Sequence, residues 1–297
     1  MSDSTRTGIL LLDKPLGLSS NAALQRLRRL LGAAKAGHVG SLDPLATGML
    51  PICLEEATKI AGDILAGRKC YRFTVGLGAR TATGDAEGAI IEQLAVPGLT
   101  PAQIEQALGG FLGSQSQIPP MYSALKHGGQ PLYRLARAGQ EVERAARLIE
   151  ISSLTLVSFE ELRLSLEVIC SKGTYVRTLA EDIARALGTC GYVTQLRRMY
   201  VEPFESEAMC TLEGVAALRA AGQWPAIMAA DFAIRHLGAV HLDAPDSARL
   251  LHGQAIRNAA AASLSGRVRL YDEAARFLGI GEADGQGEVR PRRLFVL

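Results

Sequence analysis

Two stretches of the chain alternate between apolar and polar residues with the period of a β-strand. The alternation runs from 69 to 77 and again from 162 to 170. Successive side chains of a strand point to opposite faces, so each stretch predicts a strand with one buried face. The apolar positions are Tyr71, Phe73, Val75 and Leu77 in the first stretch, and Leu162, Leu164, Leu166 and Val168 in the second. Any fold of this chain must therefore include half-buried strands.

Helical patterns accompany these strands. An apolar stripe with helical spacing predicts a helix from about Ser20 to Leu31, which Gly32 ends. A second helix is predicted over Val176–Leu187 from the same kind of spacing. Because this helix follows a predicted strand after a short turn, we expect Tyr175 and Arg177 in its first turn, where backbone N–H groups can face an anion. The chain thus mixes helices and strands.

The remaining segments complete a coarse map of the chain. We expect strands at 8–12, 49–54, 148–156 and 193–199, and helices at 55–65, 100–110 and within 211–237. After His241 short apolar pieces alternate with Gly-rich turns, which is typical of a small β module of about 55 residues.

A basic stretch follows a segment that cannot form regular structure. Residues 117–124 include Pro119 and Pro120, and residues 126–147 follow as a surface excursion with a short helix near 131–138. Its basic residues are Lys126, Arg134, Arg137, Arg144 and Arg147. The net charge of the chain is only +2, so a polyanion would have to be held by such a local patch. The alternative is ordinary solvated surface charge.

Cysteine usage and hydropathy exclude several classes of protein. The chain has five cysteines, none in CxxC spacing and none accompanied by a histidine cluster. A zinc site and a disulfide framework are therefore not expected, and reduced thiols favour a cytoplasmic protein. The N-terminal residues lack the apolar run of a signal peptide, and no stretch of about 20 apolar residues predicts a membrane span.

One carboxylate, Asp43, stands in the glycine-rich stretch Gly37–Leu50. Pro44 disfavours a helical conformation at Asp43, so the carboxylate is expected in an extended or turn segment from which it can point into a cleft. His38 lies five residues before it and Thr47 four residues after it. Taken alone, this pattern favours a loop Asp that hydrogen-bonds its own turn. Other parts of the sequence are needed to distinguish a functional carboxylate in a cleft from a structural Asp in a turn.

Six blocks, in this order along the chain, resemble the bacterial tRNA pseudouridine synthase B (TruB) family, whose members make pseudouridine 55 in the T-arm of tRNA. The blocks are Leu12–Ser20, Gly37–Leu50, Lys69–Phe73, Gln117–Lys126, Ser171–Arg177 and Leu196–Arg198. The resemblance covers nearly the whole chain. One departure is Ala82, at a position where the family usually has an acid between two threonines. That change puts a polar contact from this position in doubt and leaves the expected chemistry intact.

The resemblance implies an α+β fold with two parts. Residues 8–238 would form the catalytic domain, a mixed, mostly antiparallel sheet with flanking helices, whose cleft is crossed by the excursion at 120–147. Residues 240–297 would form a small PUA-like RNA-binding β-barrel. The partner would be the T-arm stem-loop of tRNA, bound by a monomer that needs no obligate protein partner. No cofactor is expected, because the rearrangement of uridine to pseudouridine is redox-neutral and requires no nicotinamide or flavin. No metal is expected either.

The resemblance also implies a role for each site residue. Asp43 would act as the nucleophile or stabilise charge at C1′, and Arg177 would keep it ionised and aimed. The target uridine must leave the base stack, so Tyr71 would pack on the extruded base, and its hydroxyl is a candidate for moving the C5 proton. The other expected contacts are His38 in the space left in the RNA, Tyr175 and the Leu196 backbone on the target nucleotide, and Lys126, Arg134, Arg137, Arg144 and Arg147 on phosphates.

Three alternatives remain open from the residues. A non-catalytic RNA-binding or tRNA-folding module would not need the set Asp43, Tyr71 and Arg177. A hydrolase acting on a nucleoside or glycoside would be expected to carry a second recognisable carboxylate, and would not need the basic excursion. A related enzyme that acts on other RNAs, guided by a partner complex, would fit long Lys-rich tails, which this chain lacks.

Overall fold

The computed structural model describes residues 6–296, and its centre is one eight-stranded sheet. The strands are β1 (Gly8–Lys14), β2 (Ala36–His38), β3 (Ala46–Leu54), β4 (Lys69–Leu77), β7 (Gly113–Gln117), β10 (Arg147–Glu160), β11 (Arg163–Cys170) and β12 (Gly191–Val201). Their order is β1-β3-β12-β4-β11-β10-β7, with β2 paired to β3. Only the β12–β3 pair of this sheet is parallel among the described residues. The expected mixed, mostly antiparallel sheet is confirmed.

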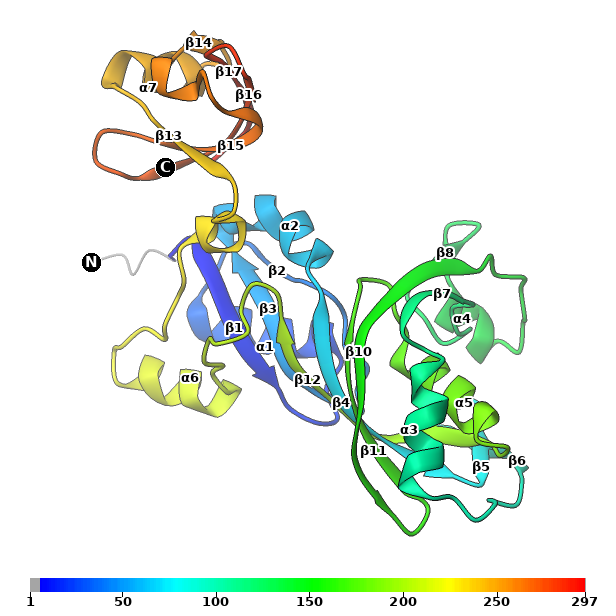
Figure 1. Cartoon of the computed structure of the whole chain (residues 1–297). Coiled ribbons are helices and arrows are strands. Elements are labelled where there is room, and N and C mark those ends of the chain that lie inside the picture. Colours follow the sequence, from blue (N-terminus) through cyan, green and yellow to red (C-terminus); the bar gives the residue numbers. More distant parts are fainter. Residues whose placement is uncertain (1–5, 297) are drawn as a thin grey trace.

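Helices cover one face of this sheet. They are α1 (Ser20–Leu31), α3 (Pro101–Gly109), α5 (Val176–Ala186) and α6 (Leu212–Ala220) (Figure 1). Their apolar stripes bury a core that includes Leu27 of α1, Ile183 of α5 and Phe73 of β4. Amphipathic helices gain most of their stability from burying such a stripe. The helices predicted at 20–31 and 176–187 are confirmed within one residue at each end.

A second core lies on the opposite face near β1. Leu10 and Leu12 of β1 belong to the first core, whereas Ile9 and Leu11 belong to the second. The continuous apolar run at the start of the chain is therefore a strand buried on both faces. The second core is completed by η1 (Glu55–Ile60), α2 (Ala61–Ala66) and η2 (Ala230–Ile234).

The prediction of a single helix at 55–65 is wrong in detail. The segment is a 3-10 helix, η1, followed by the short α2. Glu55 has a φ of +48°, and its carboxylate accepts hydrogen bonds from the backbone N–H groups of Ala34 and Lys35 instead of capping its own helix. This contact with a distant segment fixes the first turn, and sequence periodicity does not record it.

The C-terminal residues form a separate five-stranded sheet. Its order is β13-β15-β16-β17-β14, with β13 (Gly238–His241), β14 (Ile256–Arg257), β15 (Ser265–Tyr271), β16 (Phe277–Asp284) and β17 (Glu288–Leu294). The expected small β module is present as a curled lobe at one end of the molecule (Figure 1). It also holds α7 (Ala244–Leu251) and η3 (Ala259–Ala261), so the apolar pair Leu250 and Leu251 belongs to the end of a helix and not to a strand.

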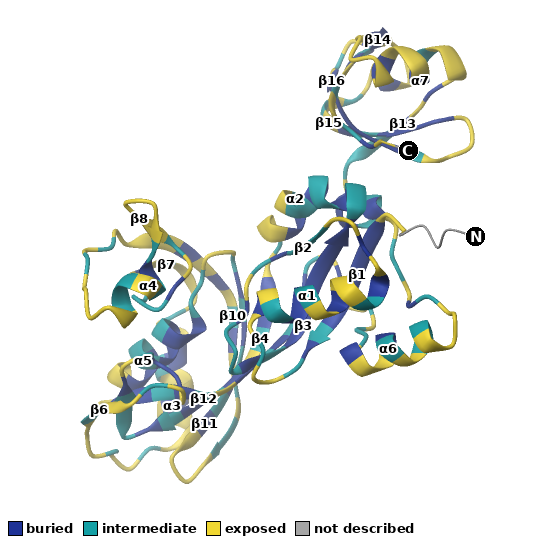
Figure 2. Cartoon of the chain, turned by 180° about the vertical axis from the view of Figure 1, so that it is seen from behind, coloured by how far each residue is buried: buried dark blue, intermediate teal, exposed yellow. Residues whose placement is uncertain are grey.

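The excursion leaves the main sheet between β7 and β10. It contains β8 (Lys126–His127), β9 (Gln130–Pro131) and α4 (Leu132–Arg137), which confirms the short helix expected there. Figure 2 shows that much of this segment is exposed. A further small sheet, β5 (Ala79–Thr81) with β6 (Ile90–Gln93), frames the loop at 82–89. Among the described helices, none combines the length and hydropathy needed to cross a bilayer.

Candidate active site

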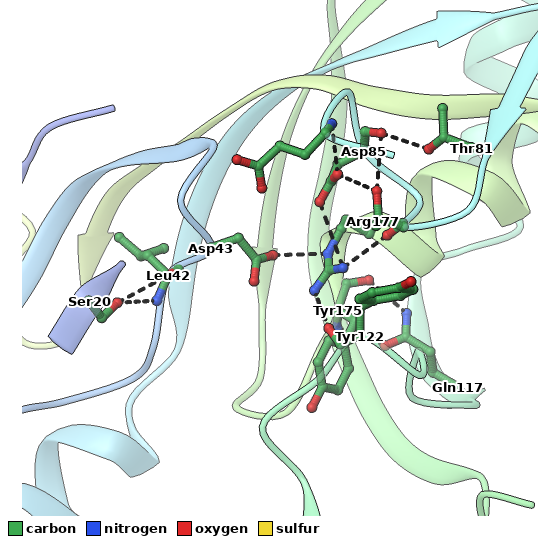
Figure 3. A network of polar contacts seen from close by, with 11 residues as sticks. Ser20, Leu42, Asp43, Thr81, Asp85, Gln117, Tyr122, Tyr175 and Arg177 are labelled. Carbon is green, nitrogen blue, oxygen red and sulfur yellow. Dashed lines mark hydrogen bonds and ion pairs between the residues drawn. The ribbon is translucent and has the colours of Figure 1, made fainter. Parts of the chain in front are cut away.

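Asp43 and Arg177 meet in the structure, although 134 positions separate them in the sequence. Asp43 lies in the loop between β2 and β3, and Arg177 lies in the first turn of α5. The Arg177 Nε is 2.9 Å from the Asp43 Oδ2 (Figure 3), and the two side chains are 6% and 39% exposed. Arg177 is therefore a buried cation, while the carboxylate it holds remains open to an incoming molecule.

The other nitrogens of Arg177 are also engaged. Nη1 donates to the carbonyl of Thr83 at 2.9 Å, and Nη2 donates to the carbonyl of Tyr122 at 2.8 Å. Nη1 also lies 3.7 Å from Oδ2 of Asp85. A guanidinium presents its donors in one rigid plane, so these contacts from two segments fix its orientation. Arg177 is thereby aimed at Asp43.

Asp85 is a second carboxylate beside Arg177, and the sequence assigned it no role. Its side chain is only 4% exposed and accepts hydrogen bonds from the Thr83 hydroxyl and the Glu87 backbone N–H. A buried carboxylate needs such partners to stay charged. Asp85 is therefore a buried, hydrogen-bonded partner of Arg177 and is far less accessible than Asp43. The only sequence feature that could have pointed to Asp85 is its position in a run of threonines and acids in the loop after β5.

Three further side chains hold the backbone of the Asp43 loop. The Ser20 hydroxyl donates to the Leu42 carbonyl at 3.0 Å and accepts from the Leu42 N–H at 2.7 Å. Lys14 donates to the Pro44 carbonyl at 3.4 Å. Arg198 donates to the Gly40 carbonyl at 2.9 Å. Sequence analysis missed Ser20 and Arg198, because they act through tertiary contacts.

Two glycines of this region have a positive φ and lie against the buried Arg198. Gly40 has a φ of +71°, and a Cβ there would lie 3.2 Å from the Arg198 guanidinium. Gly48 has a φ of +99°, and a Cβ there would lie 2.1 Å from the Arg198 carbonyl oxygen. A larger residue would be strained by the positive φ at either position, and at Gly48 it would also collide with the β12 backbone. These glycines let the loop pack against β12.

Burial and the neighbouring positive charges act in opposite directions on the pKa of Asp43. Burial raises the pKa of the Asp43 carboxyl above its ordinary value, and the charge of Asp85 raises it further. Arg177 and Lys14 counter this rise by favouring the ionised form. Burial also lowers the pKa of Lys14 to about 8. Arg177 is thus the main group that keeps Asp43 charged.

Tyr71 lies on β4, and His38 is the last residue of β2, directly before the Asp43 loop. The Tyr71 hydroxyl is 3.5 Å from Nη1 of Arg198, and burial raises its pKa. Burial, followed by the charge of Arg198, lowers the pKa of His38, so its imidazole is neutral near pH 7. Its Nδ1 is buried and has no hydrogen-bond partner among the described residues. The structure brings both residues close to Arg198.

Tyr175 and Leu196 are placed by backbone structure. Tyr175 is the N-cap of α5, because its φ and ψ of −100° and 109° are extended. The prediction that it lies in the first turn of the helix is therefore wrong. Leu196 lies on β12 between Phe73 of β4 and Ala46 of β3, its register partners on the two sides. Ala46 begins β3 directly after the Asp43 loop, so the Leu196 backbone lies beside the end of that loop.

The basic residues of the excursion differ in availability. Arg144 is half-buried and pairs with Glu141 at 3.5 Å. The other four are exposed and pair with no carboxylate in the part of the chain that the structure describes; they are Lys126, Arg134, Arg137 and Arg147. Arg137 also lies over the ring of Tyr133, 5.7 Å from its centroid. These four side chains could reach a polyanion without breaking an existing ion pair.

Comparison with known proteins identifies the family. The family model described as TruB family pseudouridylate synthase (N terminal domain) matches residues 28–176. The models described as tRNA pseudouridylate synthase B C-terminal domain and Pseudouridine synthase II TruB, C-terminal, match residues 177–227 and 238–295. A protein of Chromohalobacter salexigens named tRNA pseudouridine synthase B is 51% identical over 288 residues, covering 97% of this chain and 94% of that protein. The chain belongs to the TruB family.

Other members of the TruB family match equally broadly, which confirms the resemblance inferred from the six blocks. A tRNA pseudouridine synthase B of Aromatoleum aromaticum is 51% identical over 287 residues, covering 97% of this chain and 92% of that protein. The fold is also that of a solved structure described as a Cbf5-Nop10-Gar1 complex. The TM-score is 0.73 at 24% identity, with 99% of this chain and 84% of that chain covered. At that identity the structural likeness shows the fold alone.

Proposed function

We propose that this TruB-family chain isomerises uridine 55 in the T-arm of tRNA to pseudouridine. The observation that carries the proposal is the partly exposed Asp43 carboxylate held by the buried Arg177. Relatives that are 51% identical over nearly the full chain are named tRNA pseudouridine synthase B, which supports the same reaction. The non-catalytic and hydrolytic alternatives lack such support.

The reaction breaks the N1–C1′ bond of uridine, turns the base and joins C5 to C1′. The proton on C5 passes to solvent, and the freed N1 takes up a proton. The Asp43 carboxylate has one of two roles. It acts as the nucleophile, at C1′ or at the base, or it stabilises the charge that develops at C1′. Arg177 keeps this carboxylate ionised against the effect of burial. Atoms and electrons balance without any oxidant or reductant, so the chemistry requires no nicotinamide or flavin.

The target uridine has to leave its stack to reach Asp43. The face of Tyr71 packs on the extruded base, and its hydroxyl is the candidate group for moving the C5 proton. His38, as a neutral imidazole, fills the space left in the RNA, and Tyr175 and the Leu196 backbone contact the nucleotide. Their positions around the Asp43 loop are compatible with these roles.

Catalysis and RNA binding are assigned to different parts of the chain. Residues 8–238 carry the chemistry, and residues 240–297 form a PUA-like RNA-binding unit. The chain acts as a monomer without an obligate protein partner. A tRNA substrate and five free thiols fit a cytoplasmic location.

A tritium-release assay tests the proposed reaction. A T-arm stem-loop carrying [5-³H]uridine at the target position should release tritium in step with pseudouridine formation at that position. The products are measured by nucleoside analysis after digestion of the RNA. Free uracil in place of pseudouridine would indicate the hydrolase, and tight binding without tritium release would indicate the non-catalytic module.

Charge on the excursion should set the salt dependence of RNA binding. Alanine at Lys126, Arg134 and Arg137 together should weaken binding, because each exposed cation that neutralises a phosphate releases a counterion. The slope of log K against log salt should decrease by about 0.7–0.9 for each phosphate that the variant no longer neutralises. Binding is measured by fluorescence anisotropy at several salt concentrations.

The matched control for the excursion is Arg185→Ala. Arg185 is an exposed arginine whose charge is already paired with Asp182. This variant should leave the slope unchanged. An unchanged slope in the triple variant would exclude the excursion from phosphate binding.

A further inference from the structure

Gln117 is a buried amide at the point where the excursion leaves the sheet. It is the last residue of β7 and is 5% exposed. Its Oε1 accepts a hydrogen bond from the Tyr175 N–H at 2.8 Å, and its Nε2 donates to the Tyr175 carbonyl at 3.2 Å (Figure 3). A side-chain amide offers one acceptor and one donor group in a single plane, so this two-point contact fixes the Tyr175 backbone in position and orientation.

The backbone that Gln117 holds is the start of α5. Tyr175 is the N-cap, and its side chain makes no capping hydrogen bond. The Tyr175 carbonyl also accepts the N–H of Leu179 and thereby closes the first turn of the helix. Arg177 lies inside that turn. The position of Arg177 relative to the sheet therefore depends on the contact between Gln117 and Tyr175.

Both ends of the excursion converge at the same place. Arg147, where the chain returns, is the register partner of Gln117 in the β10–β7 pair. Within the excursion, the Tyr122 carbonyl accepts a hydrogen bond from Nη2 of Arg177. The segment that carries the exposed cations is thus attached to Arg177 twice, once directly through Tyr122 and once through Gln117 and Tyr175.

We propose that Gln117 is a positioning residue that fastens the stem of the excursion to the first turn of α5, so that Arg177 stays aimed at Asp43 when the excursion holds RNA. The inference rests on the proposed function. Gln117 itself touches no reacting atom. Its effect is to keep the guanidinium within reach of the carboxylate, and a displacement of about 1 Å in such a group can cost about 100-fold in rate.

The pH profile separates this role from a general effect on folding. Asp43 is faced by Arg177 of α5, Lys14 of β1, Asp85 and Glu87 of the loop after β5, and the phenols of Tyr71 and Tyr175. Of these, Gln117 holds Tyr175 directly and Arg177 through the first turn of α5, and Arg177 is the only one of the two that carries a charge. A displaced Arg177 would leave the burial of Asp43 less compensated, so a higher pH would be needed to ionise it.

The test compares Gln117→Met, Gln117→Glu and the control Gln115→Met. Gln115 lies on the same strand, and its amide donates to the Gly110 and Leu112 carbonyls, outside the site. Single-turnover tritium release and stem-loop affinity are measured from pH 5 to 9. Gln117→Met should lower the rate at neutral pH by about 10- to 100-fold, keep the affinity within about twofold, and move the acid limb to higher pH. Gln117→Glu, which keeps the acceptor for the Tyr175 N–H, should recover part of the rate.

The outcomes distinguish this inference from the proposed function. An unchanged rate in Gln117→Met, with an active wild-type enzyme, would overturn the positioning role and leave the function intact. A loss of affinity and melting temperature with an unmoved acid limb would also overturn it, since that result indicates structural support alone. A wild-type chain that forms no pseudouridine would instead refute the proposed function.

Discussion

Asp43→Asn should abolish pseudouridine formation while leaving RNA binding intact. The amide is nearly isosteric with the carboxylate but carries no charge and is a poor nucleophile. We expect the single-turnover rate to fall by at least about 10⁴-fold, which is the scale on which losing a nucleophile acts. Stem-loop affinity should stay within about threefold, because the proposed phosphate contacts lie on the excursion. Tritium release and fluorescence anisotropy measure the two quantities on the same preparation.

The control for this variant is Asp182→Asn. Asp182 pairs with exposed Arg185 on α5, outside the site, and should tolerate the same chemical change. A wild-type rate in Asp43→Asn would refute the assignment of Asp43. A parallel loss of rate and affinity would mean that Asp43 serves in binding.

Arg177→Met should lower the rate by about 100-fold at neutral pH. Removing one partner of a buried ion pair costs about 3–5 kcal/mol, and the lower end applies because Asp43 is partly exposed. Each 1.36 kcal/mol corresponds to a factor of ten. Burial still raises the pKa of Asp43 in this variant, while the largest opposing charge is gone. The ionised, active form therefore requires a higher pH.

The pH dependence of the rate checks the sign of this effect. The rate of Arg177→Met should recover partly as pH rises, so the deficit relative to wild type should be largest at low pH. Arg185→Met removes an exposed arginine from the same helix and should leave the profile unchanged. A uniform deficit at all pH values would show that Arg177 does not keep Asp43 ionised. Because Asp85 also loses its cation, a lower melting temperature should accompany the change.

The sequence predicted well the elements whose stability comes from a repeating pattern. The alternation at 69–77 corresponds to β4 with the same bounds, because every second side chain of that strand enters the core. The apolar stripe and Gly32 likewise located both ends of α1. Periodicity succeeds where burial on one face decides the local conformation.

Contacts between distant segments were beyond such reasoning. The Asp43–Arg177 pair was expected only through the family resemblance, since no local pattern connects the two residues. Asp85, Ser20 and Gln117 were given no role, because a buried polar residue acquires its meaning from a partner that only the tertiary fold supplies. The helix α7 was missed for a related reason, as its eight residues lie among short strands and bury few side chains.

The decisive measurement for the role of Asp43 is a structure of this chain bound to a T-arm stem-loop that carries 5-fluorouridine at the target position. The fluorine replaces the C5 proton whose departure completes the reaction. We expect the nucleotide to lie outside the RNA stack, with its base against Tyr71 and with the Asp43 carboxylate, still paired to Arg177, next to C1′ or the base. A target nucleotide that remains stacked in the RNA, or that binds away from Asp43, would contradict it.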